Sequence, residues 1–185
     1  NQNNTYLMNI FVTDPSPRIS AQVLPDKHVV KMPLESCQML SVIFSHWYYD
    51  WGDDIVCKQD GTPYKVAKGA FRNHPCTVWA ADSLYNTAWL IQHGCALSSE
   101  YKHRYGKKHG CADTLFEAKK IFQKITGEAI TSYGMADNFA RAMPDNFKYD
   151  KSIDTFTAYK KYIASKPWVS SNYLRDPSRK PEWIT

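Results

Sequence analysis

The amino-acid sequence predicts a mainly α-helical protein, a compact single-domain helical bundle with a short extended segment near its N-terminus. A length of 185 residues fits one domain. Long stretches space their apolar residues at the period of a helix, and proline, glycine or small polar residues stand at their ends. The chain shows no internal repeat and no low-complexity linker. We therefore expect residues 1–185 to form one domain, with residues 1–5 loose and the aromatic and basic tail 166–185 packed on the core.

Near the N-terminus, the apolar run Tyr6–Thr13 predicts a strand or an extended segment that packs on the core. The prolines of residues 14–17 break this run. Ser16 can cap a short helix that runs through Leu24, with Pro17 at its first position.

The stretch Pro25–Tyr48 predicts the central helix. At 100° per residue, most of its circumference is apolar, and a narrow polar stripe carries His28, Lys31 and Glu35. Pro33 lies inside it and removes one backbone hydrogen bond. We expect a kink just before Glu35; the alternative is two helices that meet at residues 32–33.

The rest of the chain predicts a polar connector followed by further helices. In the connector, residues 50–69, a small hairpin can form around residues 60–61. One helix is expected from Pro75, capped by residue 73 or 74, to about residue 104, with Gly106 ending it. A second helix is expected to begin at residue 113 or 114 and to end at Gly127. A third is expected to follow residue 152, which caps it, and to end at about residue 165.

Composition narrows the choice of partners. The net charge of +5 permits an anionic partner, and 12 Tyr and 6 Trp suit surfaces that stack on planar ligands or bases as well as a core. Five cysteines without a CxxC pair predict reduced thiols and an intracellular, cytoplasmic protein. Their spacing fits no standard zinc site. We therefore expect no metal, and we also expect no cofactor. No apolar run is long enough to span a membrane, so we expect no membrane partner.

The polar stripe of the central helix is the first candidate site. A carboxylate such as Glu35 in a partly dry cleft can act as a general acid or base, or can stabilise a cationic intermediate. A nearby lysine can attack a sugar carbon. The alternative is a solvated helix face with a Lys31–Glu35 ion pair.

Two basic segments are candidate anion sites. Arg72, Asn73 and His74 precede a helix, whose N-terminal N–H groups favour phosphate; simple capping is the alternative. Residues 100–109 interleave aromatic and basic side chains, as nucleic-acid contacts do. Dipole-matched cations at a helix C-terminus are the alternative there.

Several reaction classes are disfavoured, because the sequence carries no Walker loop, GxGxxG, GxSxG, HExxH or EF-hand pattern. This disfavours nucleotide-driven enzymes, serine hydrolases and zinc proteases.

A resemblance to a known family appears in the same central stretch. Asp26 and His28 form an Asp-x-His pattern, and Glu35 follows seven residues after the histidine. This resembles the first catalytic helix of the pyrimidine-dimer DNA glycosylase/AP lyases of endonuclease V type. The RNHP motif at residues 72–75 and the segment 158–166, AYKKYIASK, are also similar to parts of that family. The chain further resembles small phage proteins that begin MNIF, as residues 8–11 do.

The resemblance implies a compact helical fold, DNA binding with base flipping, and Glu35 as the catalytic carboxylate. His28 and Arg72 would contact DNA or order the site. Members of this family use their N-terminal α-amine as the nucleophile. Here residues precede Asn9, so an amine there needs processing or a different start. Otherwise Lys31 or Lys27 would serve, or there is no lyase step. Pro33 and the connector 50–69 depart from the family's pattern.

We therefore expect a phage-type DNA glycosylase-like enzyme that acts on a flipped pyrimidine base, in the host cytoplasm if phage-encoded. The alternatives are a transferase that hypermodifies a pyrimidine in phage DNA and a non-catalytic nucleic-acid-binding protein. The expected partner is DNA and the expected state is a monomer. The predicted catalytic residues are Glu35, His28 and Lys31, and the predicted DNA-binding residues are Arg72, Asn73, His74, Arg104, Lys107 and His109.

Overall fold

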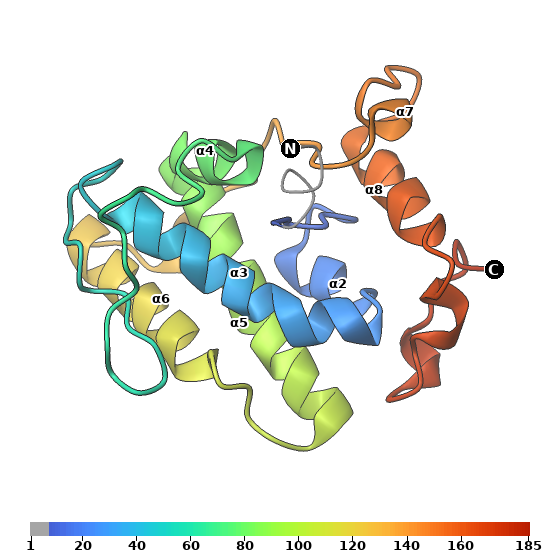
Figure 1. Ribbon diagram of the computed structural model, residues 1–185, viewed down its shortest axis with the longest axis horizontal. Helices are drawn as coiled ribbons and strands as arrows, with labels where there is room; N and C mark the ends of the chain where they lie inside the picture. The colour runs from blue at the N-terminus through green and yellow to red at the C-terminus, as the bar shows by residue number, and fades with distance from the viewer. Residues whose placement is uncertain (1–7) are drawn as a thin grey trace.

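The computed structural model describes residues 8–185, and this part of the chain is helical and contains no β-strand (Figure 1). The predicted fold class is confirmed. The expectations for residues 1–5 and for the start of the run Tyr6–Thr13 lie outside the described residues. The helices are α2 (Pro17–Gln22), α3 (Asp26–Phe44), α4 (Pro75–Ala81), α5 (Leu84–Tyr105), α6 (Ala112–Thr126), α7 (Asp145–Lys148) and α8 (Thr155–Ala164), with 3₁₀ turns at Ile130–Ser132, Val169–Ser171 and Pro177–Arg179.

The core forms where α3 crosses α5, with α6 beside the pair (Figure 1). Leu40 and Ile43 of α3 and Leu90 and Ile91 of α5 are fully buried. Burying such a side chain stabilises the folded state by about 1.5–3 kcal/mol. Because α3 is covered on most sides, its narrow polar stripe cannot all reach bulk water.

Helix α3 is continuous through Pro33, so the alternative of two separate helices is not observed. Pro33 has no N–H to donate to the carbonyl of Val29. The helix begins at Asp26, as the sequence indicates, and ends four residues before Tyr48.

The expectation of one helix from Pro75 to about residue 104 is wrong, because the chain breaks between α4 and α5. Ser83 has extended backbone angles (φ −152°, ψ 157°), and its side chain accepts a hydrogen bond from Asn86 N at 3.1 Å. A serine that caps a new helix in this way interrupts an otherwise continuous apolar pattern. Gly106, at φ 70°, ends α5 in the left-handed conformation as expected.

The segment 8–13 is buried and forms no strand within the described chain. Asn9 fixes its shape, because its Oδ1 accepts hydrogen bonds from the N–H groups of Ile10 and Phe11, both at 2.8 Å. The Asn9 amide also donates to the carbonyl of Ala142 at 2.7 Å. The segment is therefore held against the residues that precede α7.

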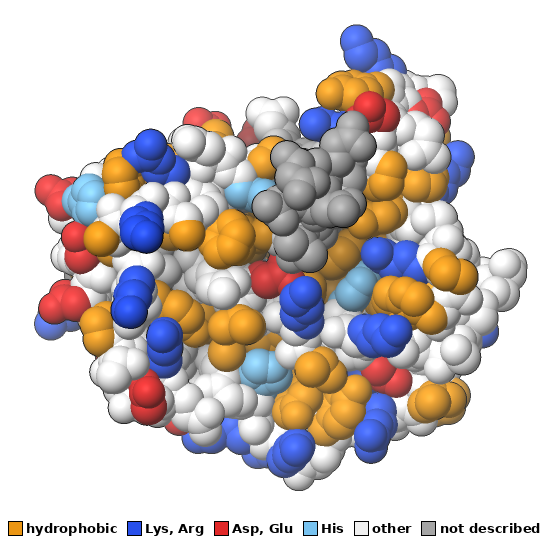
Figure 2. Space-filling model, viewed as in Figure 1, with side chains coloured by type: hydrophobic (Ala, Val, Ile, Leu, Met, Phe, Trp, Pro, Cys, Tyr) orange, Lys and Arg blue, Asp and Glu red, His pale blue; other side chains and the backbone are white. Residues whose placement is uncertain are grey.

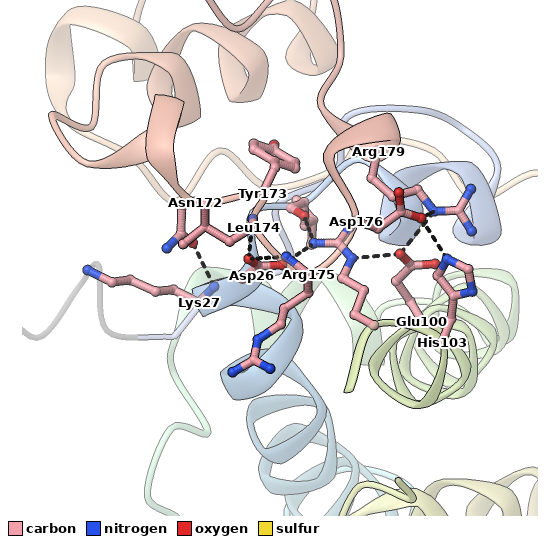
Figure 3. A network of polar contacts seen from close by, with 12 residues as sticks. Asp26, Lys27, Glu100, His103, Asn172, Tyr173, Leu174, Arg175, Asp176 and Arg179 are labelled. Atoms are coloured by element: carbon pink, nitrogen blue, oxygen red, sulfur yellow. Dashed lines mark hydrogen bonds and ion pairs between the residues drawn. The ribbon is translucent and has the colours of Figure 1, made fainter. Parts of the chain in front are cut away.

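The tail docks on the first turn of α3. Asn172 accepts hydrogen bonds from Asp26 N with its carbonyl at 2.7 Å and from Lys27 N with its side chain at 2.8 Å (Figure 3). Asp26 in turn accepts hydrogen bonds from Leu174 N at 2.9 Å and Arg175 N at 3.3 Å. Helix α3 has no side-chain cap of its own, so the tail supplies the missing acceptors.

The connector 50–69 carries a single antiparallel bridge between Cys57 and Pro63, around a turn with Gly61 at φ 85°. This is a smaller version of the expected hairpin. No helix within residues 8–185 combines the length and the apolar character needed to cross a bilayer.

Candidate active site

Glu35 is the centre of the site. Its side chain projects from the middle of α3 and is 3% exposed. Its Oε1 accepts a hydrogen bond from Asn9 N at 2.9 Å. Its Oε2 is buried and accepts no hydrogen bond from the described residues. A carboxyl group that is dry and half-satisfied is poorly solvated as an anion.

Burial raises the pKa of Glu35 to about 7, although the charge of Lys31 and the hydrogen bond from Asn9 both act to lower it. Near neutral pH the group is therefore present in both its protonated and its ionised form. That is the condition under which a carboxyl group works well as a general acid or base.

His28 lies two turns before Glu35 on nearly the same face of α3 and is 7% exposed. Its ring stacks on Phe11, with centroids 3.9 Å apart, and meets the edge of Trp168 at 5.6 Å. Burial, followed by the charges of Lys166, Lys31 and Lys27, lowers the pKa of His28 to about 3. The imidazole is therefore neutral at physiological pH and presents a flat aromatic wall.

Three lysines surround these two residues. Lys31 is exposed and makes no ion pair with Glu35 in the described chain, so the alternative of a Lys31–Glu35 surface pair is not observed. Lys27 Nζ lies 4.4 Å from the ring centroid of Trp168. Lys166 Nζ lies 4.4 Å from the ring centroid of Tyr162, and burial lowers its pKa.

A hollow of about 490 Å³ opens beside the first turns of α3. It lies between this helix, the end of α5 and the tail, and it is lined by Asp26, Lys27, Val30, Lys31, Tyr105, Asn172, Leu174 and Arg175. The Arg175 guanidinium lies 4.6 Å from the ring centroid of Tyr105. Figure 2 shows lysine and arginine side chains spread over this face of the molecule. Cations and aromatic surface thus meet in one recess.

Arg104 does not reach that surface. Its side chain is fully buried and donates to Glu100 at 2.7 Å, to Asp26 at 3.2 Å and to the carbonyls of Leu24 and Gln22. Arg179 adds a second ion pair to Glu100 at 3.1 Å. The guanidinium of Arg104 is hydrogen-bonded within this internal network and is not free to bind a phosphate.

The RNHP segment lies at the start of α4. His74 caps this helix, because its Nδ1 accepts a hydrogen bond from Cys76 N at 3.1 Å. Arg72 is half-buried with its guanidinium 4.0 Å from the ring centroid of Trp47, and Asn73 is exposed. The capping alternative therefore accounts for His74, while Arg72 and Asn73 remain near the surface.

The two predicted DNA-binding residues that follow α5, Lys107 and His109, also differ in whether they are free at the surface. Lys107 is exposed. Both ring nitrogens of His109 are engaged, since Nδ1 accepts from Cys111 N at 2.9 Å and Nε2 donates to the carbonyl of Val30 at 2.8 Å. His109 therefore ties the loop before α6 to α3.

The structure thus brings His28, Lys31 and Glu35 together, as the sequence predicts. The sequence does not reveal Phe11 as part of the site. It indicates Lys166, Trp168 and Arg175 only as members of the aromatic and basic tail, and Asn9 only through the resemblance. Within the described residues, no group of three or more His, Cys, Asp or Glu could hold a metal ion.

Comparison with known proteins adds one finding. Residues 8–113, a little over half of the chain, match a family model described as pyrimidine dimer DNA glycosylase. The matched segment begins one residue before Asn9 and includes His28, Lys31 and Glu35. Neither the curated proteins nor the solved structures contain a match.

Proposed function

The chain belongs to the pyrimidine dimer DNA glycosylase family, and we propose that it is an enzyme that releases a pyrimidine base from DNA, with Glu35 as its catalytic carboxyl group. The observation that carries this proposal is the buried carboxyl of Glu35 against the backbone nitrogen of Asn9, 2.9 Å away. The family supports the class of reaction, and this contact supports the choice of Glu35 and the nitrogen of Asn9 as the groups at the reaction centre.

Cleavage of the bond between a base and C1′ leaves positive charge on the sugar. The ionised form of Glu35, in a site where burial excludes water, stabilises that charge strongly. The protonated form can deliver a proton. A pKa near 7 makes both forms available at neutral pH.

The nucleophile depends on the N-terminus of the active chain. While Asn9 is joined to Met8, its nitrogen is an amide and cannot attack C1′, so water activated by Glu35 would be the nucleophile. In a chain whose first residue is Asn9, the α-amine would occupy the same place beside Glu35. Loss of a proton to Glu35 would then free the amine to attack C1′ and displace the base, which leaves with a proton. The C1′–O4′ bond of the sugar then opens and gives an imine that permits a lyase step.

DNA would lie over the recess beside α3. Lys27, Lys31 and Arg175 border that recess and can neutralise phosphates. Phe11, His28 and Trp168 form an aromatic group that suits a flipped base. We also assign phosphate contacts to Arg72, Asn73 and Lys107, which lie near the surface; Arg104, His74 and His109 are left out because they hold other parts of the chain.

The test is base release from duplex DNA that carries a cyclobutane pyrimidine dimer, with undamaged duplex as the reference. Glu35→Gln should slow release by at least about 100-fold while DNA binding is kept, because the amide cannot ionise. The control is Glu117→Gln, the same change at an exposed position of α6, which should retain full activity.

Borohydride trapping then separates the two nucleophiles. A chain that begins at Asn9 should give a covalent adduct with damaged DNA, and a chain that retains residues 1–8 should not. Full activity of Glu35→Gln, or no base release by either chain, would contradict the proposal. No observation favours a base transferase or a non-catalytic binding protein, so neither is proposed.

A further inference from the structure

A pair of cysteine thiols lies farther along α3, beyond the part of the helix that borders the recess. Cys37 is on α3, two residues after Glu35, and Cys111 directly precedes α6. The two thiols are close enough to interact with each other, and each also interacts with the hydroxyl of Tyr64. Leu34 and Gln38, which flank Cys37 on α3, line the same hollow as Cys111 and Tyr64. Both cysteines are free thiols in this structure.

The two sulfur atoms differ in access. Cys37 is fully buried. Cys111 is half-buried and lines a hollow of about 430 Å³ together with Gln38, Tyr64 and two lysines, Lys58 and Lys65. A small molecule can therefore reach Cys111 from solvent, while Cys37 lies directly behind it.

The surroundings of Cys111 favour its thiolate. Interaction with the Cys37 thiol, and then with His109, holds the pKa of Cys111 at about 5 against the opposing effect of burial. Cys111 is also the N-cap residue of the 15-residue helix α6, whose positive end stabilises a nearby anion. Interaction with Cys111, and then burial, raises the pKa of Cys37, which keeps its proton.

We propose that Cys111 is a modification site that reacts with hydroperoxides, and that Cys37 converts the product into a disulfide between α3 and the start of α6. This goes beyond the proposed action on DNA and does not depend on it.

The chemistry balances in two steps. The Cys111 thiolate attacks the terminal oxygen of a hydroperoxide, the O–O bond breaks, and the protonated leaving group departs as an alcohol or water, leaving a sulfenic acid on Cys111. The sulfur of Cys37 then attacks the Cys111 sulfur, and water leaves with the proton of Cys37. Two thiols are oxidised by two electrons and one hydroperoxide is reduced.

The reduced geometry already suits this sequence. Exchange and condensation reactions of thiols need the attacking sulfur to lie next to the sulfur that is attacked. Cys37 and Cys111 interact directly, and Cys111 lies beside Leu34 and Gln38, which flank Cys37 on α3. His109 fixes the loop of Cys111 to the carbonyl of Val30 on α3. This contact holds the position of Cys111 relative to the helix that carries Cys37.

The test exposes the chain of residues 1–185 to hydrogen peroxide at pH 7, blocks free thiols with N-ethylmaleimide and maps the peptides by mass spectrometry. The expected product is a Cys37–Cys111 disulfide. Cys111→Ser should abolish it. Cys37→Ser should stop at a sulfenic acid on Cys111 that dimedone traps. Cys57→Ser, which removes another half-buried cysteine, should leave the disulfide unchanged.

A rate on the unmodified chain protects the test against a variant that fails to fold. Iodoacetamide should alkylate Cys111 at least about tenfold faster than Cys95, whose pKa burial raises to about 11. Equal rates at these two cysteines, or random pairing among the five cysteines after peroxide treatment, would overturn the proposal.

Discussion

Helix α3 buries two carboxylates and treats them in opposite ways. Asp26, in its first turn, is 6% exposed and pairs with Arg104 at 3.2 Å, while two backbone N–H groups of the tail donate to its other oxygen. Glu35, nine residues later, is 3% exposed and receives one hydrogen bond, from Asn9 N. The two residues have the same chemistry, the same helix and nearly the same burial.

This difference fits a structural role for Asp26 and the proposed catalytic role for Glu35. A buried charge costs stability unless it is paired and hydrogen-bonded. Asp26 meets both conditions and ties α3 to α5 and the tail. Glu35 meets neither condition fully, and a buried carboxyl group left in that state is a candidate for proton transfer.

The largest expected effect comes from removing the partner of the paired carboxylates. Arg104→Met leaves Asp26 and Glu100 buried without their shared cation and should lower the free energy of unfolding by about 3–5 kcal/mol, measured by urea denaturation. Lys107→Met, at an exposed position three residues away, is the control and should change it by less than about 0.5 kcal/mol. Equal losses in the two variants would remove the basis of the comparison.

A second substitution, Glu35→Gln, should raise the free energy of unfolding at neutral pH instead of lowering it. The pKa of Glu35 rises from 4.5 to about 7 on folding, so folding favours the protonated form. This preference contributes roughly 3 kcal/mol to the free energy of unfolding below pH 4.5, and that contribution is lost as the pH rises from 4.5 to 7. Glu35→Gln cannot ionise, so it should match the parent near pH 4.5 and exceed it by up to this amount above pH 7.

Urea titrations at several pH values measure that difference. Glu117→Gln is again the control, and its offset from the parent should not widen between pH 4.5 and 7. A Glu35→Gln variant that is less stable than the parent at pH 7 would mean that the ionised carboxylate is stabilised after all.

The smallest effect tests whether burial, rather than pairing alone, makes Asp26 structural. Lys108 and Asp113 form an ion pair at 2.9 Å, but both side chains are largely exposed. Lys108→Ala should alter the free energy of unfolding by less than about 0.5 kcal/mol, against the large loss for Arg104→Met. A loss of several kcal/mol would show that exposed pairs also hold this fold.

Local sequence signals located most of the helices and the key carboxyl group. Ser16, Gly106 and Gly127 mark helix ends because their effects act within one turn. The spacing of His28 and Glu35 marks the site for the same reason, since both residues lie on one helix.

The remaining features depend on contacts between distant segments. Arg104 seemed a surface cation at a helix end, yet its partner Asp26 is 78 positions away and turns it inward. The contact of Asn9 with Glu35 joins segments 26 positions apart. Periodicity and capping carry no information on such pairs, so the sequence could name the residues but not their neighbours.

The docking of Asn172 on the first turn of α3 sets an order of events during synthesis. Asp26 and Lys27 leave the ribosome early, but the acceptors for their N–H groups come from a residue near the other end of the chain. The helix that carries Glu35 therefore lacks this cap until synthesis has reached Asn172, 145 residues after Lys27. A nascent or cut chain without Asn172 lacks this support for the helix that carries Glu35.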